Sequence, residues 1–160
     1  VWGKNGTTTQ TVAANTLTTA AFTGTKFNFI AVHAFHAVAA NPHFRVGSTT
    51  VDSGSNYAFR RSYNGGADVV AASQAEFQMS GVASTQDTFY VLYSINIDGE
   101  EKLFIGFQIR QNSAGAANAP HRRELVGKWA NTSNQFDIVQ AVASTGNISN
   151  DSNITALGTD

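Results

Sequence analysis

Apolar and polar positions alternate along several short stretches of this chain, and clusters of turn-forming residues separate one stretch from the next. A period of two is typical of β-strands, because successive side chains of a strand point to opposite faces of the sheet. The sequence has no convincing amphipathic helix, which would show an apolar period of 3.6 residues. The pattern therefore predicts an all-β fold, either a sandwich or a closed barrel of short strands.

The clearest pattern is that of a β-hairpin. Residues 89–97 (FYVLYSINI) and 102–110 (KLFIGFQIR) flank the dipeptide Asp98-Gly99. Asp-Gly favours a type I′ turn, which requires a positive φ at both central positions. Two matching sets of apolar side chains each share one strand face: Phe89, Val91, Tyr93, Ile95 and Ile97, and then Leu103, Ile105, Phe107 and Ile109. A shift of one residue would move every one of them to the wrong side of the sheet, so the pattern predicts a fixed register.

Other segments predict further strands. Residues 26–40 (KFNFIAVHAFHAVAA) are apolar on both alternating faces, which favours a strand buried on both faces until Asn41-Pro42 ends it. Residues 111–120 (QNSAGAANAP) have no periodicity and predict a long loop, a candidate for contact with a neighbour or ligand. The remaining predicted strands cover residues 43–51, 57–63, 76–80, 122–129 and 135–142, with a last short strand near Ile148, Ile154 and Leu157.

The first 25 residues differ from the rest, because they are rich in Thr, Ala, Asn and Gly and have few large apolar side chains. They predict an extended arm, residues 1–25, with one short strand around residues 9–14, in front of a single domain, residues 26–160. Both a flexible terminus and an arm that becomes ordered on a neighbouring subunit fit this composition. The chain begins with Val rather than Met, as expected if a start residue or leader was removed or left out, and its first ten residues contain no apolar signal-peptide core.

The composition of the chain limits the kinds of partner that it is expected to bind. The 160 residues include no cysteine, and a chain of this length is expected to be stable without disulfides or metal. Charged residues make up 13% of the chain and the net charge is −1, so the surface must consist largely of uncharged polar residues. Such a surface neither repels other copies strongly nor attracts the phosphates of nucleic acid. No stretch approaches the roughly 20 apolar residues that cross a bilayer. We expect neither a nucleic-acid nor a membrane partner.

Catalytic and metal-binding patterns are weak. His33 and His36 would point to opposite sides of a strand, while His43 and His121 lie in or beside predicted loops, with no cysteine to complete a metal site. Residues 52–56 have alternating oxygen ligands, as in a calcium loop, but lack the acidic residues that close the shell. No G-x-S-x-G elbow is present. We predict no metal, no cofactor and no enzymatic activity; a hydrolase with scattered carboxylates stays the remaining alternative.

The order of these segments resembles a module of tailed-bacteriophage virion proteins, found in tail, tail-fibre or capsid-associated chains. The resemblance covers residues 22–160 and runs through FNFIAVHAFH, FRVGS, VDSGSNYAFRRS, the hairpin, QFDIVQAV and ISNDSNITALGTD. Its most specific part is the D-x-G-x-N-Y turn formed by Asp52, Gly54, Asn56 and Tyr57. In such a turn the glycine relieves the backbone, the Asp and Asn side chains satisfy it, and the tyrosine enters the sandwich. The N-terminal arm has no match in the module.

The resemblance implies an antiparallel jelly-roll-like β-sandwich on the surface of a virion, in contact with copies of itself and with other virion proteins. The alternative is a carbohydrate-binding or receptor-binding module that recognises a host-surface glycan. Sugars stack on exposed aromatic rings, for which Trp2, Tyr57, Tyr63 and Trp129 are the candidates. Arg60 and Arg122 belong to short basic clusters, which we interpret as solvated faces or subunit ion pairs. Trp2, Tyr63, Arg60, Arg122 and Trp129 are therefore the predicted ligand or subunit contacts.

Overall fold

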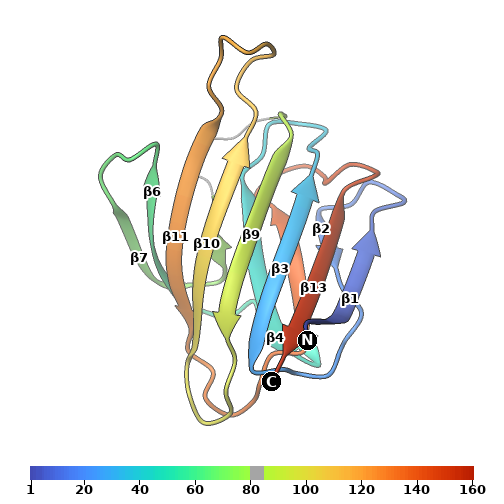
Figure 1. Cartoon of the computed structure of the whole chain (residues 1–160), viewed down its shortest axis with the longest axis vertical. Coiled ribbons are helices and arrows are strands. Elements are labelled where there is room, and N and C mark those ends of the chain that lie inside the picture. The colour runs from blue at the N-terminus through green and yellow to red at the C-terminus, as the bar shows by residue number, and fades with distance from the viewer. Residues whose placement is uncertain (80–84) are drawn as a thin grey trace.

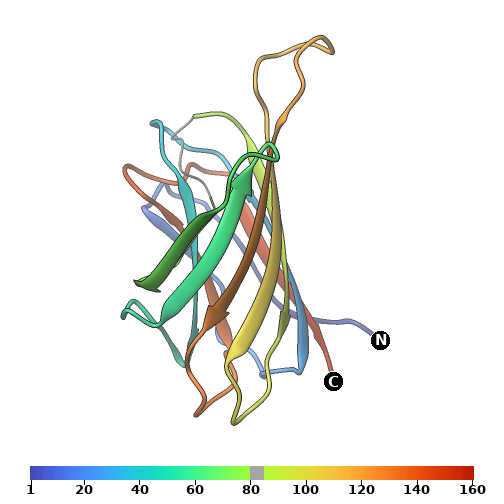
Figure 2. The ribbon, with the colours of Figure 1, turned by 90° about the vertical axis from the view of Figure 1, so that its left-hand side faces the viewer.

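The chain forms an all-β antiparallel sandwich in which an eight-stranded sheet packs against a five-stranded one (Figures 1 and 2). The structure is a computed structural model and describes residues 1–79 and 85–160. The larger sheet contains β1 (Gly3–Thr9), β3 (Phe27–Ala34), β6 (Tyr57–Tyr63), β7 (Val69–Gln74), β9 (Thr88–Ile95), β10 (Lys102–Arg110), β11 (His121–Trp129) and β13 (Asn153–Thr159). The smaller contains β2 (Thr16–Thr18), β4 (Pro42–Ser48), β5 (Thr50–Val51), β8 (Phe77–Gln78) and β12 (Ile138–Ala143). The predicted fold class is confirmed.

The strand order explains how distant segments come together. The larger sheet runs β1-β13-β3-β9-β10-β11-β6-β7, and the smaller runs β2-β12-β4-β5, with β8 paired to β4. The chain passes repeatedly from one sheet to the other, for example between β3 and β4, between β5 and β6 and between β11 and β12, as in a jelly-roll-like sandwich. Within the described part of the chain, no helix is long and apolar enough to cross a membrane.

The core lies between the two sheets and is centred on aromatic rings. Phe104 of β10 lies 4.9 Å from Phe77 and 5.7 Å from Phe136, measured between ring centroids. Phe77 in turn meets the ring of Tyr57 edge-on, at 5.0 Å. All four rings are at most 2% exposed, so the interior is filled by side chains from both sheets and from the loop before β12.

Residues 1–25 are extended, as predicted, but they form part of the sandwich rather than an arm in front of it. β1 pairs with β13 at the edge of the larger sheet, β2 pairs with β12, and Leu17 is 1% exposed in the core. Two strands replace the single one expected around residues 9–14. The physical reason is that a sheet edge offers unpaired backbone groups, which a Thr-rich segment satisfies without an apolar pattern. A contact of this segment with a neighbouring subunit stays a prediction.

The two apolar sets of the hairpin share one face, as predicted, with Ile105 opposite Tyr93 and Phe107 opposite Val91. The turn of the hairpin differs from the prediction. Residues 96–101 connect the strands, and only Gly99, with φ 83°, has the positive φ that a type I′ turn requires at both central positions. Asn96 explains the difference, because its buried amide donates hydrogen bonds to the carbonyls of Thr25 and Phe136. These bonds hold the chain after β9 against neighbouring loops instead of letting it continue in the ladder.

The apolar set of the hairpin points outward, away from the smaller sheet. Along β10 the inward positions include Lys102 and Phe104, while Leu103 and Ile105 are 54% and 53% exposed. β3 was predicted to be buried on both faces, and this is wrong for its outer face, where Phe27 is 40% exposed. The reason is that the smaller sheet covers only one side of the larger one.

The other predicted strands correspond to β4 and β5, β6, β11, β12 and β13. β7 was not predicted, and the strand expected over residues 76–80 is represented by the two residues of β8, with residue 80 outside the described part of the chain. Residues 111–120 form a loop, as predicted, and it projects beyond the end of the sandwich (Figure 1).

Candidate recognition surface

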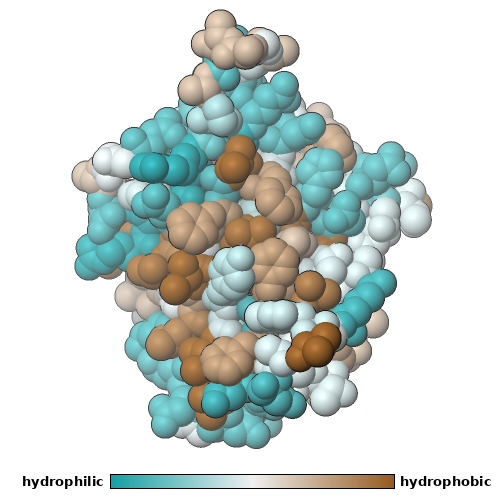
Figure 3. Space-filling view, in the orientation of Figure 1, coloured by the Kyte–Doolittle hydropathy of each residue, from teal (hydrophilic) through white to brown (hydrophobic). Residues whose placement is uncertain are grey.

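The outer face of the larger sheet carries a continuous apolar surface across its central strands, surrounded by polar residues (Figure 3). We call it the apolar face. It consists of the outward side chains of β3, β9 and β10 and one from β11: Phe27, Phe29, Ala31, Phe89, Val91, Tyr93, Ile95, Leu103, Ile105, Phe107, Ile109 and Val126. Tyr93 and Ile105 lie near its centre.

Strand pairing places these residues in rows. One row crosses the sheet from β13 to β7 through directly paired neighbours: Leu157, Phe29, Tyr93, Ile105, Val126, Arg60 and Val70. The rings of Phe29 and Tyr93 lie 5.1 Å apart in a tilted contact. Cross-strand apolar pairs of this kind stabilise a sheet, yet here the same side chains stay in contact with solvent.

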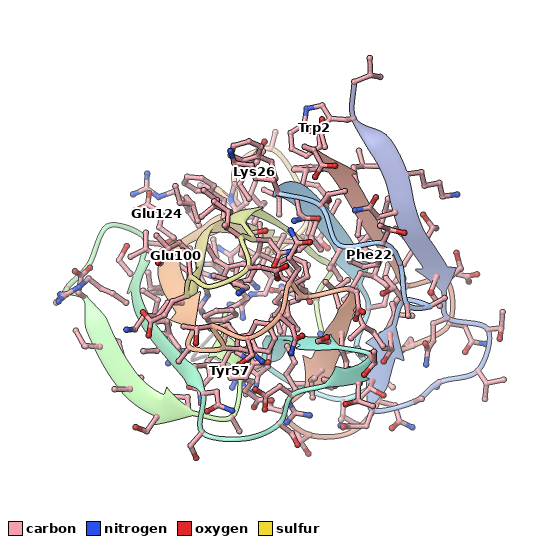
Figure 4. All side chains as sticks on the ribbon, turned by 90° about the horizontal axis from the view of Figure 1, so that it is seen from below. Trp2, Phe22, Lys26, Tyr57, Glu100 and Glu124 are labelled. Carbon is pink, nitrogen blue, oxygen red and sulfur yellow. The ribbon has the colours of Figure 1, made fainter. Side chains whose placement is uncertain are left out.

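Trp2 extends the apolar face at one corner. Its side chain is 47% exposed and lines a shallow groove of about 440 Å³ with Phe27, Tyr93, Leu103 and Ile105. Figure 4 shows Trp2 beside Lys26 on the outer side of the larger sheet, whereas Tyr57 lies on the opposite side. Trp2 was a predicted contact residue, and in the structure it lies on the apolar face.

A second hollow of about 550 Å³ adjoins the first. It lies over β10, β11, β6 and β7, and its lining includes Leu103, Ile105, Val126, Arg60 and Val70. Leu103 and Ile105 line both hollows, so the two form one shallow apolar surface rather than separate pockets.

Charged residues border the apolar face on the side of β11 and β6, and each has a partner of opposite sign. Lys128 contacts Glu101 at 2.7 Å, Arg122 contacts Glu124 at 3.4 Å, and Arg60 contacts Asp68 at 3.1 Å. The opposite border, on β13 and β1, includes the uncharged residues Thr7, Asn153, Thr155 and Thr159. It also has a few charges of both signs: Lys4 is paired opposite Leu157, the Lys26 ammonium lies 5.2 Å from the ring centroid of Phe27, and Asp160 accepts a hydrogen bond from the Lys26 backbone N–H. The border as a whole is therefore close to neutral.

The predicted turn motif lies at one end of the sandwich, behind the apolar face. The Asp52 carboxylate accepts hydrogen bonds from the backbone N–H of Gly54 (2.8 Å), the Asn56 amide (2.8 Å) and the Trp129 indole (2.7 Å). Burial acts to raise the pKa of Asp52, but these three hydrogen bonds outweigh it and lower the pKa below its ordinary value. A Cβ on Gly54 would lie 3.1 Å from the Asn56 amide, so close packing rather than positive φ favours glycine there.

Tyr57 completes the turn and lies inside the sandwich. Its hydroxyl lies 2.8 Å from the carbonyl oxygen of Val46 and 2.9 Å from that of Asp52, which share its one proton, and it accepts a hydrogen bond from the Val46 N–H (3.0 Å). Tyr57 and Trp129 are each 1% exposed. Both were candidates for sugar stacking, and Trp129 also for subunit contact. These assignments are wrong for the described structure, because the Asp52 carboxylate and the packed core hold both rings away from the surface.

The remaining predicted contact residues lie elsewhere on the larger sheet. Tyr63 is half-buried; its hydroxyl forms a hydrogen bond with His121 Nδ1, and the Arg123 guanidinium lies 4.3 Å from its ring centroid. Burial, and then the charges of Arg110 and Arg61, lower the pKa of Arg123 to about 10. Tyr63 is thus held by an internal cluster and does not join the apolar face.

One polar cluster was not predicted from the sequence. Glu76, just before β8, receives His43 Nδ1 on one carboxylate oxygen and the Arg45 guanidinium, at 2.7 Å, on the other. Burial would raise the pKa of Glu76, but the hydrogen bond and charge of His43, together with Arg45, lower it. His43 and Arg45 alternate on β4, so their strand spacing was the available signal, but nothing in the sequence indicated that Glu76 would meet them. Among the described residues, no three His, Asp or Glu side chains are grouped to hold a metal ion.

The comparisons with known proteins place the chain in no family. No protein-family model matches the sequence, and no curated protein sequence matches it. Among solved structures, the CBM2 module of the evolved Dit of Lactobacillus casei BL23 phage J-1 is similar over 100% of this chain and 80% of that one, with 9% sequence identity and a TM-score of 0.27. A TM-score this low supports no conclusion about function, so the function proposed below rests on this chain's own residues.

Proposed function

We propose that the chain is a structural virion protein of a phage-like particle, either a capsid decoration or a tail or fibre component, which acts by assembly and surface presentation and not by catalysis. The observation that carries the proposal is the apolar face. Nine side chains, Trp2 and eight members of the face, are between 40% and 54% exposed. A large apolar side chain has a surface of roughly 150–250 Å², so nine side chains that are about half exposed leave roughly 800 Å² of apolar surface in contact with solvent. The largest apolar patch of an ordinary monomer is roughly 300–600 Å².

A surface of this size favours a protein partner over a small-molecule substrate. The two hollows are shallow and apolar, and few polar groups converge in them to orient a reacting molecule. The phage-like order of the strands and of the D-S-G-S-N-Y turn supports a position on the virion surface, where repeated copies turn weak contacts into avidity. The expected partners are copies of the chain and other virion proteins.

The test is whether the chain is part of a particle. Particles from cells that carry the gene would be purified on a density gradient and probed with an antibody against the chain, followed by gold labelling in the electron microscope. We expect the chain to co-sediment with the particles in many copies and the label to decorate a capsid or a tail. A chain found only in the soluble fraction would contradict the proposal.

Glycan binding is the second candidate, and Trp2 is the observation in its favour. Its indole is 47% exposed and shares the groove with Phe27 and Tyr93, which offers rings for sugar stacking. Sugar hydroxyls also need polar partners, and this groove is mostly apolar, so the protein-contact function has the stronger support. A glycan array probed with the wild type and with Trp2→Ala tests the candidate. Binding that the substitution abolishes would support it, and an array without any binding would contradict it.

A further inference from the structure

We propose that the apolar face is the contact through which two copies of this chain associate, with larger sheet against larger sheet. The inference rests on the proposed function, since it names the partner of the same surface. It concerns the central residues of the face, Tyr93 and Ile105, which a two-fold contact would place near its axis.

The area of the face agrees with a dimer. Roughly 800 Å² per copy would give roughly 1,600 Å² in total, the standard size of a specific protein–protein interface. The side chains that make up this area include Tyr93, which is 49% exposed, Ile105, which is 53% exposed, and Phe107, which is 46% exposed. A contact of this size and apolar character resembles a sandwich core divided between two chains, and sheets pack face to face in this way at a spacing of roughly 10 Å.

The distribution of charge favours a second copy over a partner of different composition. The centre of the face has no charged side chain, and on the side of β11 and β6 the charges of the border are paired within the chain, as in Lys128 with Glu101 and Arg122 with Glu124. On the side of β13 and β1 the border has Lys4, Lys26 and Asp160, which are of both signs. A border with an excess of one sign would repel its own copy. This border does not, and the net charge of −1 adds little repulsion. The surface is therefore self-compatible, as a two-fold contact requires.

The apolar centre also argues against a hydrated ligand. Along the central row, Phe29, Tyr93, Ile105 and Val126 offer only one side-chain hydrogen-bonding group, the Tyr93 hydroxyl. A polar ligand laid across them would lose water without gaining partners, which costs free energy. A second apolar sheet loses no such hydrogen bonds.

Sedimentation velocity of the purified full chain tests the proposal, over concentrations of about 1–100 µM. We expect a dimer in the wild type. Ile105→Lys and Tyr93→Thr should each weaken dimerisation by about tenfold or more, because charge or lost apolar area at the centre of an interface costs most. Both side chains point outward, so circular dichroism and the melting temperature should show a retained fold. Val12→Lys is the matched control, since Val12 is 75% exposed outside the face.

Cross-linking gives a second, independent measurement, made simple by the absence of cysteine from the chain. In Ile105→Cys each copy carries a single thiol near the expected axis, and a short bis-maleimide should join two chains with high yield. In Val12→Cys the same reagent should leave the chains unjoined. Tyr93→Thr/Ile105→Cys, with a weakened contact, should show reduced cross-linking.

The outcomes separate this inference from the proposed function. A wild-type chain that is monomeric over the whole range, or a dimer that persists in both Ile105→Lys and Tyr93→Thr, would overturn the inference. If such a monomer co-sediments with particles, and Ile105→Lys abolishes this, another virion protein covers the face and only the inference fails. A dimer sensitive to both substitutions, in a chain absent from particles, would support the inference and contradict the proposed virion function.

Discussion

The indole Nε1 of Trp129 donates a 2.7 Å hydrogen bond to the Asp52 carboxylate, and this contact ties the end of β11 to the turn between β5 and β6. The two residues are 77 positions apart in the sequence. The same carboxylate also holds the Gly54 N–H and the Asn56 amide. The D-S-G-S-N-Y turn is therefore stabilised by a buried tryptophan as well as by its own Asp and Asn side chains.

Substitution of Asp52 should destabilise the fold. The Asp52 carboxylate accepts hydrogen bonds from three donors. In Asp52→Asn the side-chain amide nitrogen replaces one of the two carboxylate oxygens and must face one of these donors, so one hydrogen bond becomes a donor–donor contact. We expect a loss of about 1–3 kcal/mol in the free energy of unfolding at pH 7. Urea unfolding measures it, and Trp129→Phe with the double variant completes a thermodynamic cycle. A sum of the two single losses equal to that of the double variant would show that the pair is not coupled.

Acid should destabilise the chain through Asp52 and Glu76. The ordinary pKa is 3.8 for an aspartate such as Asp52 and 4.5 for a glutamate such as Glu76, and in the folded chain the pKa of each of these two carboxyls is lower. In this pH range the folded state therefore binds fewer protons than the unfolded state. The stability that the two ionised carboxylates contribute to the fold is fully present above their pKa in the unfolded state, and it is lost as the pH falls through their pKa in the folded state. Melting temperatures should therefore drop below about pH 4.5. Asp52→Asn and Glu76→Gln should each flatten this drop.

The β4–β5 connection should depend on Gly47. A Cβ at this position would lie 1.9 Å from the carbonyl oxygen of Thr50, a backbone atom that cannot move without disrupting the pairing of Gly47 with Val51. We expect Gly47→Ala to cost about 2 kcal/mol or more in chemical denaturation. Gly3→Ala is the matched control, because its Cβ would meet only an ordinary contact at 3.8 Å, and its unfolding should match the wild type.

Leu17 tests whether the N-terminal segment belongs to the domain. Its side chain is 1% exposed in the core, so Leu17→Ala should lower the free energy of unfolding by about 2–5 kcal/mol in the isolated chain. Val12→Ala, at a position 75% exposed, should change it by less than about 0.5 kcal/mol. Equal stability of both variants and the wild type would mean that the segment is not docked in the isolated chain.

Much of the fold was predictable because local patterns decide it. The alternation in residues 89–110 predicted both strands and the shared face of their apolar side chains, and the turn residues at 52–56 marked the correct connection. β1 and β7 were not predicted. Their pairing depends on edge backbone groups of β13 and β6, which no side-chain pattern in residues 3–9 or 69–74 indicates.

The candidate site was less predictable. Trp2 was expected to be accessible and is, while Trp129 was proposed as a contact and is buried. A tryptophan at the end of a strand fits either position by its own chemistry. The acceptor that draws the Trp129 indole inward, Asp52, comes from a turn far away in the sequence.

The sequence by itself determined that the hairpin strands pair and which side chains share a face. It did not determine which face is buried. β9 has apolar residues on both faces, such as Tyr90 and Leu92 inside and Tyr93 outside, and on β10 Lys102 turns inward while Ile105 turns outward. Periodicity divides a strand into two faces but cannot say which one another sheet will cover. Only the packing of the smaller sheet on one side decided that, and it left the apolar face open.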